Sequence, residues 1–197
     1  MDEAGRGPWA GPVVAAAVLF RERRMKPRGV NDSKKLARDA REALFEKIMK
    51  VAFVATGIAS VEEIDALNIW GATSLAMRRA LYQLPEEPHV ALIDGNLMPK
   101  NLPCEARTVV KGDGISYSIA AASIVAKVTR DRLMRELAAT YPHYGFDSHV
   151  GYGTPQHLNA IRAHGPCEIH RKRWPIQQLL QGELFSAPAE SDATWAA

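Results

Sequence analysis

Four carboxylates beside glycine residues are the side chains best suited to do chemistry in this sequence. Asp2 and Glu3 are adjacent and closely precede Gly5, while Asp94 and Asp113 are each followed directly by a glycine. All four lie at the edges of predicted strands, where α/β sheets usually bind ligands, so they could converge despite their separation in the sequence. Taken singly, Asp94 and Asp113 are better explained as turn residues, because Asp-Gly is a common turn dipeptide.

If these carboxylates meet, they favour a hard divalent cation. A cluster of acidic oxygens without a His or Cys partner suits Mg²⁺ or Mn²⁺ rather than zinc. Two such ions about 3.5–4 Å apart can clamp a phosphodiester, one activating water and the other stabilising the leaving oxygen. The sequence therefore predicts metal-dependent phosphodiester hydrolysis, on the condition that the four side chains converge.

Alternating strands and helices are expected to position these carboxylates. Short apolar runs predict strands, and apolar residues that recur every four positions after a Ser33 cap predict a first helix. Ser60 and Glu63 form the S-x-x-E pattern of a capping box that opens a long helix. This alternation predicts an α/β sheet with helices packed on its faces. The expected strands are 13–20, 51–59, 90–93 and 106–110, and the expected helices are 33–48, 60–84, 116–140 and one from Pro155 that Gly165 terminates.

The length and composition are those of one ordinary globular domain. The chain has 197 residues, of which 47% are apolar and 24% are charged, so it can bury a substantial core. We expect a single catalytic domain over residues 1–182, with a helical C-terminal part from about residue 140. The remaining segment, 183–197, is rich in Ala, Ser and Pro, and we expect it to be disordered.

Basic residues give only a weak indication of a nucleic-acid partner. The net charge is +3, and the one dense basic cluster is residues 170–173, which is best explained as a solvated surface turn. Lys34 and Lys35 are expected to open a helix, where lysine is disfavoured by the helix dipole and where phosphate binds well. They are equally consistent with phosphate contacts and with solvated first-turn residues.

The other potential ligands indicate no metal or disulfide framework. Cys104 and Cys167 form no Cys-x-x-Cys pair and are interpreted as incidental thiols of a reducing cytosol. His149, His157 and His170 have no metal-type spacing and are expected at the surface or near phosphates. The longest apolar run, residues 13–20, is too short to span a membrane, so we expect a cytoplasmic protein without a membrane partner.

The sequence from Asp2 to Val14, DEAGRGPWAGPVV, closely resembles the opening signature of ribonuclease HII, a bacterial type 2 ribonuclease H family. A match over this length is far more specific than a lone Gly-x-Gly pattern, which arises easily by chance. Matching motifs follow in the family's order and extend the resemblance to about Trp174. These motifs are NDSKKL at 31–36, IDGN at 93–96, KGD at 111–113, SIAAASIVAKVTRD at 118–131, and GYGT at 151–154 with His157.

The resemblance implies a fold and a catalytic centre. The fold would be ribonuclease H-like, a mixed central sheet flanked by helices with a helical C-terminal portion. Asp2, Glu3, Asp94 and Asp113 would be the catalytic carboxylates. Divalent Mg²⁺ or Mn²⁺ would be bound chiefly by Asp2, Glu3 and Asp94, and Asp113 would complete the site.

The resemblance also implies how substrate is bound. The backbone of Gly5, Arg6 and Gly7 would sense the ribonucleotide's 2′-hydroxyl, the group that distinguishes RNA from DNA. Tyr152 would stack on the neighbouring deoxyribose at an RNA-to-DNA junction. Ser33, Lys34 and Lys35 are assigned to substrate binding on the match of the NDSKKL motif.

The implied activity is hydrolysis of the RNA strand of RNA–DNA hybrids. It includes a cut 5′ to single ribonucleotides in duplex DNA, with two metal ions and a 3′-hydroxyl product, and it would serve ribonucleotide removal. Two alternatives remain open. The sister family ribonuclease HIII shares much of this core but usually carries an additional N-terminal domain. A nucleic-acid-binding protein could also keep the fold without the chemistry.

Some features depart from the family or add to it. Relatives usually have several residues before the Asp-Glu pair, whereas here only Met1 precedes it, so we expect weak activity that upstream residues restore. Val150 stands where many relatives have a basic residue, which puts one phosphate contact in doubt. Residues 181–185, QGELF, resemble sliding-clamp-binding peptides, although a frayed helix end explains them more simply. We expect a monomer.

Overall fold

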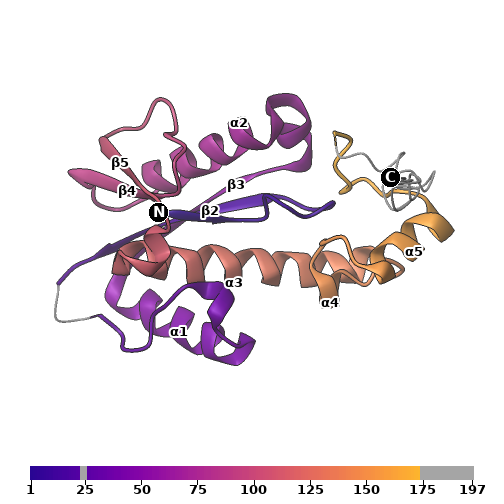
Figure 1. Cartoon of the computed structure of the whole chain (residues 1–197), viewed down its shortest axis with the longest axis horizontal. Helices are drawn as coiled ribbons and strands as arrows, with labels where there is room; N and C mark the ends of the chain where they lie inside the picture. Colours follow the sequence, from indigo (N-terminus) through magenta and orange to yellow (C-terminus); the bar gives the residue numbers. More distant parts are fainter. Residues whose placement is uncertain (23–25, 174–197) are drawn as a thin grey trace, which may run out of the picture.

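A mixed β-sheet forms the centre of the computed structural model, which describes residues 1–22 and 26–173 (Figure 1). Strands β1, β2 and β3 are antiparallel neighbours in that order, and β4 and β5 form a parallel pair. Met1 joins the two groups, because its carbonyl accepts the amide of Asp94 (3.1 Å) and its nitrogen donates to the carbonyl of Leu92 (2.6 Å). The strands are β1 (Asp2–Ala4), β2 (Val13–Phe20), β3 (Ala52–Ala59), β4 (Val90–Asp94) and β5 (Glu105–Val109).

Helices cover both faces of this sheet, as Figure 1 shows with α2 above and α1 and α3 below. Side chains alternate along β2, because successive residues of a strand point to opposite faces. Val13, Ala15 and Ala17 pack with α2 and β4 in one core, whereas Ala16 and Val18 pack with α1 and α3 in another. The predicted α/β fold with a mixed sheet is therefore confirmed. The helices are α1 (Arg38–Val51), α2 (Val61–Tyr82), α3 (Tyr117–Thr140), α4 (Phe146–His149) and α5 (Pro155–His164).

Helix α2 begins where its sequence predicts. Ser60 accepts the amide of Glu63 and the Glu63 carboxylate accepts the amide of Ser60, so the capping box is present. The helix is kinked at Asn68, whose φ of 60° is left-handed and whose side chain accepts the amides of Trp70 and Gly71. Asn68 thus recaps the helix beside the end of β1, a feature that the sequence did not predict.

The prediction of a helix that begins at Ser33 is wrong for its first turn. Ser33–Lys35 form a short 3-10 helix, η2, in which Asp32 rather than Ser33 is the cap and accepts the amide of Lys34. The backbone is extended at Ala37, and α1 starts only at Arg38. Lys34 and Lys35 therefore do not lie at the N-terminus of an α-helix, and the dipole argument for phosphate binding there fails. The following strand starts at Ala52, because α1 extends through Val51.

The C-terminal portion is helical, as expected, and forms its own apolar cluster around Met134, Phe146 and Ile161. Two surface predictions for this region are wrong. His149, His157 and His170 are buried, and so is Arg171 from the basic cluster that we interpreted as a solvated turn. Their polar atoms are hydrogen-bonded inside the protein, which is the condition for burying such groups.

No helix in residues 1–22 and 26–173 is both long enough and apolar enough to cross a bilayer. The expected tail, 183–197, and the QGELF segment, 181–185, lie outside the described residues.

Candidate active site

Three of the four predicted carboxylates line one cavity of about 510 Å³. Asp2 and Glu3 lie in β1 itself, and Asp94 is the last residue of β4, which is joined to β1 through Met1. The sheet therefore brings together side chains that are about 90 residues apart in the sequence, as the strand-edge argument predicted. The same cavity is lined by Ala4, Gly5, Arg6, Gly7, Ser33, Lys34, Ile69, Ser123, Lys127 and Tyr152.

Asp2 is buried and forms no ion pair with a side chain of the described residues, whereas Glu3 is partly buried and is paired with Arg6. Burial, followed by the charges of Glu3 and Asp94, raises the pKa of the Asp2 carboxyl to about 7. Burial also raises the pKa of Glu3, although its hydrogen bond from Arg6 acts in the opposite direction. Asp2 accepts the amide of Glu3 at 2.7 Å. A raised carboxyl pKa means that the negative charge is unfavourable there, so binding of a proton or of a cation is favoured.

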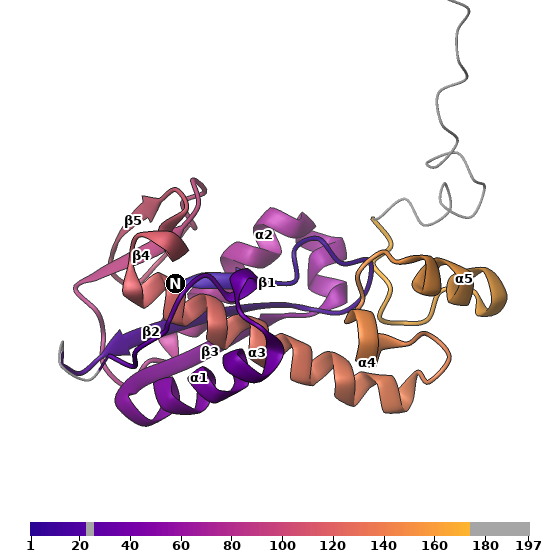
Figure 2. The same ribbon diagram turned by 60° about the horizontal axis from the view of Figure 1, so that its bottom comes forward.

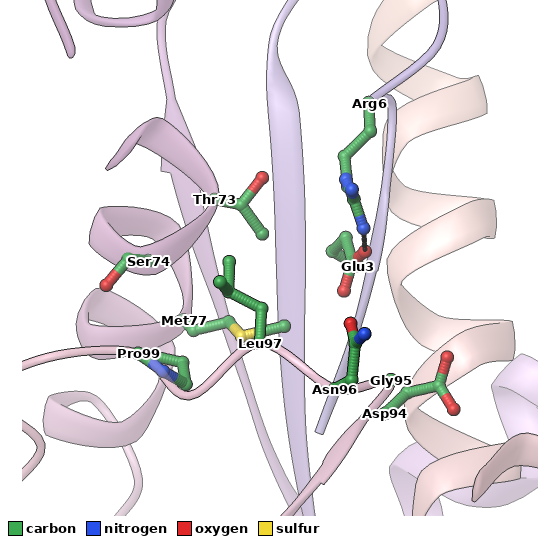
Figure 3. Close-up of a pocket in the computed structure, with 10 residues that line it drawn as sticks. All are labelled: Glu3, Arg6, Thr73, Ser74, Met77, Asp94, Gly95, Asn96, Leu97 and Pro99. Carbon is green, nitrogen blue, oxygen red and sulfur yellow. Dashed lines mark hydrogen bonds and ion pairs between the residues drawn. The ribbon is translucent and has the colours of Figure 1, made fainter. Parts of the chain in front are cut away.

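Glu3 is held by Arg6 in this structure. Figure 3 shows the Arg6 guanidinium directed at the Glu3 carboxylate, and the Nη1–Oε1 distance is 3.0 Å. The indole of Trp70, on the recapped part of α2, lies 3.9 Å from the Arg6 guanidinium carbon. Arg6 is therefore fixed between an acidic and an aromatic partner at the edge of the cavity.

Asp94 and Asp113 are connected through a tight turn. The Oδ1 atom of Asp94 accepts the amide of Gly112 at 2.7 Å, and a Cβ atom at Gly112 would lie 2.5 Å from Ile119. Glycine thus allows this close approach. Asp113 lies in the short 3-10 helix Gly112–Gly114 after β5 and does not line the cavity. Burial raises the pKa of Asp113, and the charges of Asp32 and Asp94 add to this effect, so Asp113 lies within electrostatic reach of the site.

The donor set fits a divalent cation in kind. Asp2, Glu3 and Asp94 offer only carboxylate oxygens, the ligands that Mg²⁺ and Mn²⁺ prefer. Within residues 1–22 and 26–173, however, no three acidic, His or Cys side chains converge closely enough to hold a metal ion as they stand. Glu3 is paired with Arg6, and the Asp94 carboxylate points away from Glu3 in Figure 3.

The predicted substrate-binding residues do not all reach the cavity. Gly5 and Gly7 line it, and Tyr152 lies next to Gly7, since a Cβ atom there would be 3.8 Å from the ring. Ser33 lines the cavity, but it is buried and its hydroxyl lies 2.7 Å from that of Ser123, so this hydroxyl is already hydrogen-bonded within the protein. Lys35 is exposed and does not line the cavity. No observation assigns it a contact with substrate.

The motif argument gave no direct role to Ser123 and Lys127, which also line the cavity. Lys127 forms an ion pair with Asp131, four residues further along α3, at 2.8 Å, and its ammonium also lies 5.5 Å from the Tyr152 ring. A signal for these residues exists in the sequence. Ser123, Lys127 and Asp131 are spaced by four within an alanine-rich helix, so they share one face of α3.

Comparisons with known proteins identify the family of this chain. A profile of the family described as Ribonuclease HII matches residues 1–176. The chain is 56% identical over 185 residues to Ribonuclease HII of Parvibaculum lavamentivorans, covering 93% of this chain and 68% of that protein. It is 55% identical over 183 residues to Ribonuclease HII of Jannaschia sp., covering 92% of each. The solved PCNA:RNase HII complex from Archaeoglobus fulgidus contains a similar chain, with a TM-score of 0.75, 29% identity and coverage of 88% of this chain and 92% of that one. The chain therefore belongs to the ribonuclease HII family, the type 2 ribonucleases H that cleave the RNA of RNA–DNA hybrids.

Proposed function

We propose that this protein cuts duplex DNA on the 5′ side of an embedded ribonucleotide, as well as the RNA strand of longer hybrids, and leaves a 3′-hydroxyl. One observation carries the proposal. Three carboxylates, the buried Asp2 and the partly buried Glu3 and Asp94, line the same cavity as the Gly5–Gly7 backbone and the ring of Tyr152. Groups able to hold metal ions thus face groups able to read a sugar.

Asp2, Glu3 and Asp94 are the residues that would hold divalent ions, Mg²⁺ or Mn²⁺. When bound, two such ions supply an activated water for attack on the phosphodiester and stabilise the leaving 3′-oxygen. Glu3 has to exchange its pairing with Arg6 to take part. Asp113, within electrostatic reach of Asp94, completes the acidic set and helps to orient the attacking water.

The backbone of residues 5–7 reads the ribose. Glycine at positions 5 and 7 leaves the amides and carbonyls uncovered, so they can approach a 2′-hydroxyl closely. Tyr152 is 41% exposed, and its ring stacks on the adjacent deoxyribose. A ribose at that position would carry a 2′-hydroxyl that clashes with the stacked ring. Lys34 and Lys127, which line the cavity, provide positive charge for the phosphates.

The test is cleavage of three labelled duplexes, one with a single ribonucleotide, one a full RNA–DNA hybrid and one all DNA. Each is incubated with Mg²⁺, Mn²⁺ or EDTA. A single cut 5′ to the ribonucleotide, absent with EDTA and absent from all-DNA duplex, is the expected result. A cut elsewhere, or cutting that survives EDTA, contradicts the proposal.

Two variants make the test specific. Asp94→Asn removes a charge from the cavity but keeps an oxygen that can accept the Gly112 amide, so the turn is preserved. Asp39→Asn removes a charge from an exposed position of α1 outside the cavity. Loss of cutting in the first variant together with wild-type cutting in the second is the expected pattern, and Mn²⁺ calorimetry should show weaker binding only for Asp94→Asn.

We also propose a sliding clamp as a partner, through residues 181–185. The Archaeoglobus fulgidus homologue was solved with PCNA, and the QGELF sequence is similar to clamp-binding peptides. The segment lies outside the described residues. Deletion of residues 181–185 should abolish binding to a bacterial clamp in surface plasmon resonance, and unchanged binding contradicts the assignment.

A further inference from the structure

A buried arginine from the far end of the described chain holds the glycine-rich segment of the site. Arg171 is 3% exposed. Its guanidinium donates to the carbonyl of Gly5 at 2.5 Å, of Arg6 at 2.9 Å and of Gly11 at 2.8 and 3.0 Å. Within residues 1–22 and 26–173, no carboxylate forms an ion pair with it. Its acceptors are all main-chain oxygens between β1 and β2.

Backbone pairing places Arg171 under this segment. The amide of Arg171 donates to Trp9 at 3.0 Å, the amide of Gly11 donates to Ile169 at 2.8 Å, and Ala10 forms an antiparallel bridge with His170. Figure 2 shows the end of the orange C-terminal portion beside the indigo segment that follows β1. This pairing fixes the main chain of Arg171, and so the position of its guanidinium, beside carbonyls that are some 160 residues away in sequence.

Burying a guanidinium without an acidic partner is costly, because the charge loses its hydration. Burial, followed by the nearby charge of Arg130, lowers the pKa of Arg171 to about 9. A neutral side chain could fill the same space at lower cost. We therefore explain the arginine by the order that its hydrogen bonds impose on residues 5–11. This segment contains several glycines and has no regular secondary structure.

Fixing a carbonyl also fixes the amide on the same peptide plane. In a trans peptide the C=O and N–H groups point in opposite directions. Because the Gly5 and Arg6 carbonyls point towards the buried guanidinium, the amides of Arg6 and Gly7 point away from it. In the described parts of the chain, neither amide donates a hydrogen bond to a protein acceptor. Both residues line the catalytic cavity, so two donors remain available there.

We propose that Arg171 is a positioning residue that sets the peptide planes of Gly5–Arg6 and Arg6–Gly7, and thereby presents the Arg6 and Gly7 amides to the sugar–phosphate at the cleavage site. This inference rests on the proposed function, because it explains how the site distinguishes a ribonucleotide from a deoxyribonucleotide. Arg171 itself does not touch substrate.

Arg130 has a related but separate role. It is 0% exposed and donates to Ala10, Pro12 and Val150 at 2.9–3.0 Å. These carbonyls belong to the later half of the segment and to the loop that carries Tyr152. Arg130 thus joins two loops, whereas Arg171 reaches the carbonyls of Gly5 and Arg6. The assignment of amide orientation is therefore specific to Arg171.

The experiment is a comparison of binding preferences in the full chain. Fluorescence anisotropy with Ca²⁺ in place of Mg²⁺ gives Kd for a duplex with one ribonucleotide and for the same duplex of DNA alone. We expect Arg171→Lys to lower the preference for the ribonucleotide by about tenfold or more, since one ammonium cannot reproduce the forked bonds. Its Kd for the all-DNA duplex and its Mn²⁺ affinity by calorimetry should stay close to wild type.

A control variant separates positioning from lost stability. Gly57→Ala disturbs the packing of β3 on α2, because a Cβ atom there would lie 2.0 Å from the carbonyl oxygen of Ala76, and it lies outside the cavity. Destabilisation alone lowers the active fraction equally for both duplexes and leaves their ratio unchanged. If Arg171→Lys does not fold, Arg171→Gln removes the buried charge and is tested in the same way.

The outcomes are distinct. A wild-type preference for the ribonucleotide that Arg171→Lys loses and Gly57→Ala keeps supports the inference. A preference that survives in folded Arg171→Lys or Arg171→Gln overturns the inference and leaves the proposed function intact. A wild-type protein with no preference for the ribonucleotide overturns both.

Discussion

Acid should destabilise this protein through the buried histidine cluster, His149, His157 and His170. The hydrogen bonds assign each ring a neutral form. His157 Nδ1 faces the carbonyl of Tyr152 at 2.9 Å and must carry the proton, so its Nε2 accepts from Nε2 of His170 at 3.0 Å. His170 Nδ1 in turn accepts the amide of Cys167. His149 donates to Tyr144 and accepts the amide of Gly151.

A second proton on His149 or His157 has no acceptor in the cluster. Protonated His157 would direct an N–H at the N–H of His170, and protonated His149 would direct one at the amide of Gly151. On His170, a second proton would lie on Nδ1, which already accepts the amide of Cys167 at 2.9 Å, although the Cys167 carbonyl lies 3.2 Å away. Burial raises the pKa of the nearby Cys167 thiol, so no thiolate forms to stabilise a charged ring. Burial accordingly lowers the pKa of His157 to about 4, and it lowers the pKa of His149 and His170 as well.

The sign and size of the effect follow from these pKa values. A histidine in the unfolded chain, with a pKa of about 6.5, takes up a proton as the pH falls from 7 to 5, whereas folded His157 stays neutral. The unfolded state therefore binds more protons, and stability falls as the pH falls. With a folded pKa of about 4, His157 alone removes about 2 kcal/mol between pH 7 and pH 5.

Asp2 opposes this trend, since its raised pKa of about 7 makes the folded state take up a proton in the same range. The informative quantity is therefore a difference between variants. His157→Gln can still donate to Tyr152 and accept from His170, and its unfolding free energy should fall by about 2 kcal/mol less than that of wild type between pH 7 and pH 5.

Urea unfolding followed by circular dichroism at pH 7, 6 and 5 measures this difference. His89→Gln is the matched control, because His89 is exposed and lies outside the cluster, and its pH dependence should equal that of wild type. The reasoning is refuted if His157→Gln loses as much stability on acidification as the wild-type protein does.

Three further predictions concern packing and the edge of the site. Ser123→Ala leaves the buried hydroxyl of Ser33 without its 2.7 Å partner and should lower the free energy of unfolding by about 1–3 kcal/mol. In urea unfolding, the double variant Ser33→Ala/Ser123→Ala should lose less stability than the sum of the two single variants. Gly57→Ala should cost about 1–3 kcal/mol by overpacking against α2, with unchanged cleavage per folded molecule at low temperature. Trp70→Ala removes a 46% exposed ring that packs against Arg6. The loss of about 0.5–1 kcal/mol of cation–π energy should raise KM severalfold with little change in kcat. A large fall in kcat contradicts this prediction.

Local patterns predicted the elements that depend on local interactions. The capping box at Ser60 and the helix end at Gly165 are present because each uses groups within a few residues. The start of α1 was misplaced because Asp32, one position before Ser33, competes as a cap and closes a separate turn. Small differences between neighbouring polar residues decide such boundaries, and a sequence pattern does not resolve them.

Long-range contacts explain what could not be predicted. Arg171 and the three histidines belong to residue types that usually lie at the surface, so the sequence predicted them there. Their burial depends on acceptors such as the carbonyls of Gly5 and Tyr152. Main-chain oxygens exist at every position, so no residue type marks these partners. The acidic residues were easier to single out, because carboxylates at strand edges can converge. Asp94 taken singly was nevertheless better explained as a turn residue, and the match of the motifs carried its assignment.

The choice of main-chain acceptors for Arg171 has a consequence for how the site is built. A carboxylate partner would stabilise the guanidinium wherever the loop lay, whereas carbonyls of residues 5, 6 and 11 stabilise it only when that loop is in place. The cost of burying the charge is therefore offset only in the arrangement that leaves the Arg6 and Gly7 amides facing the cavity. Docking of the C-terminal portion and ordering of the glycine-rich segment thus become one event, and the negative charge of Asp2, Glu3 and Asp94 remains available for cations.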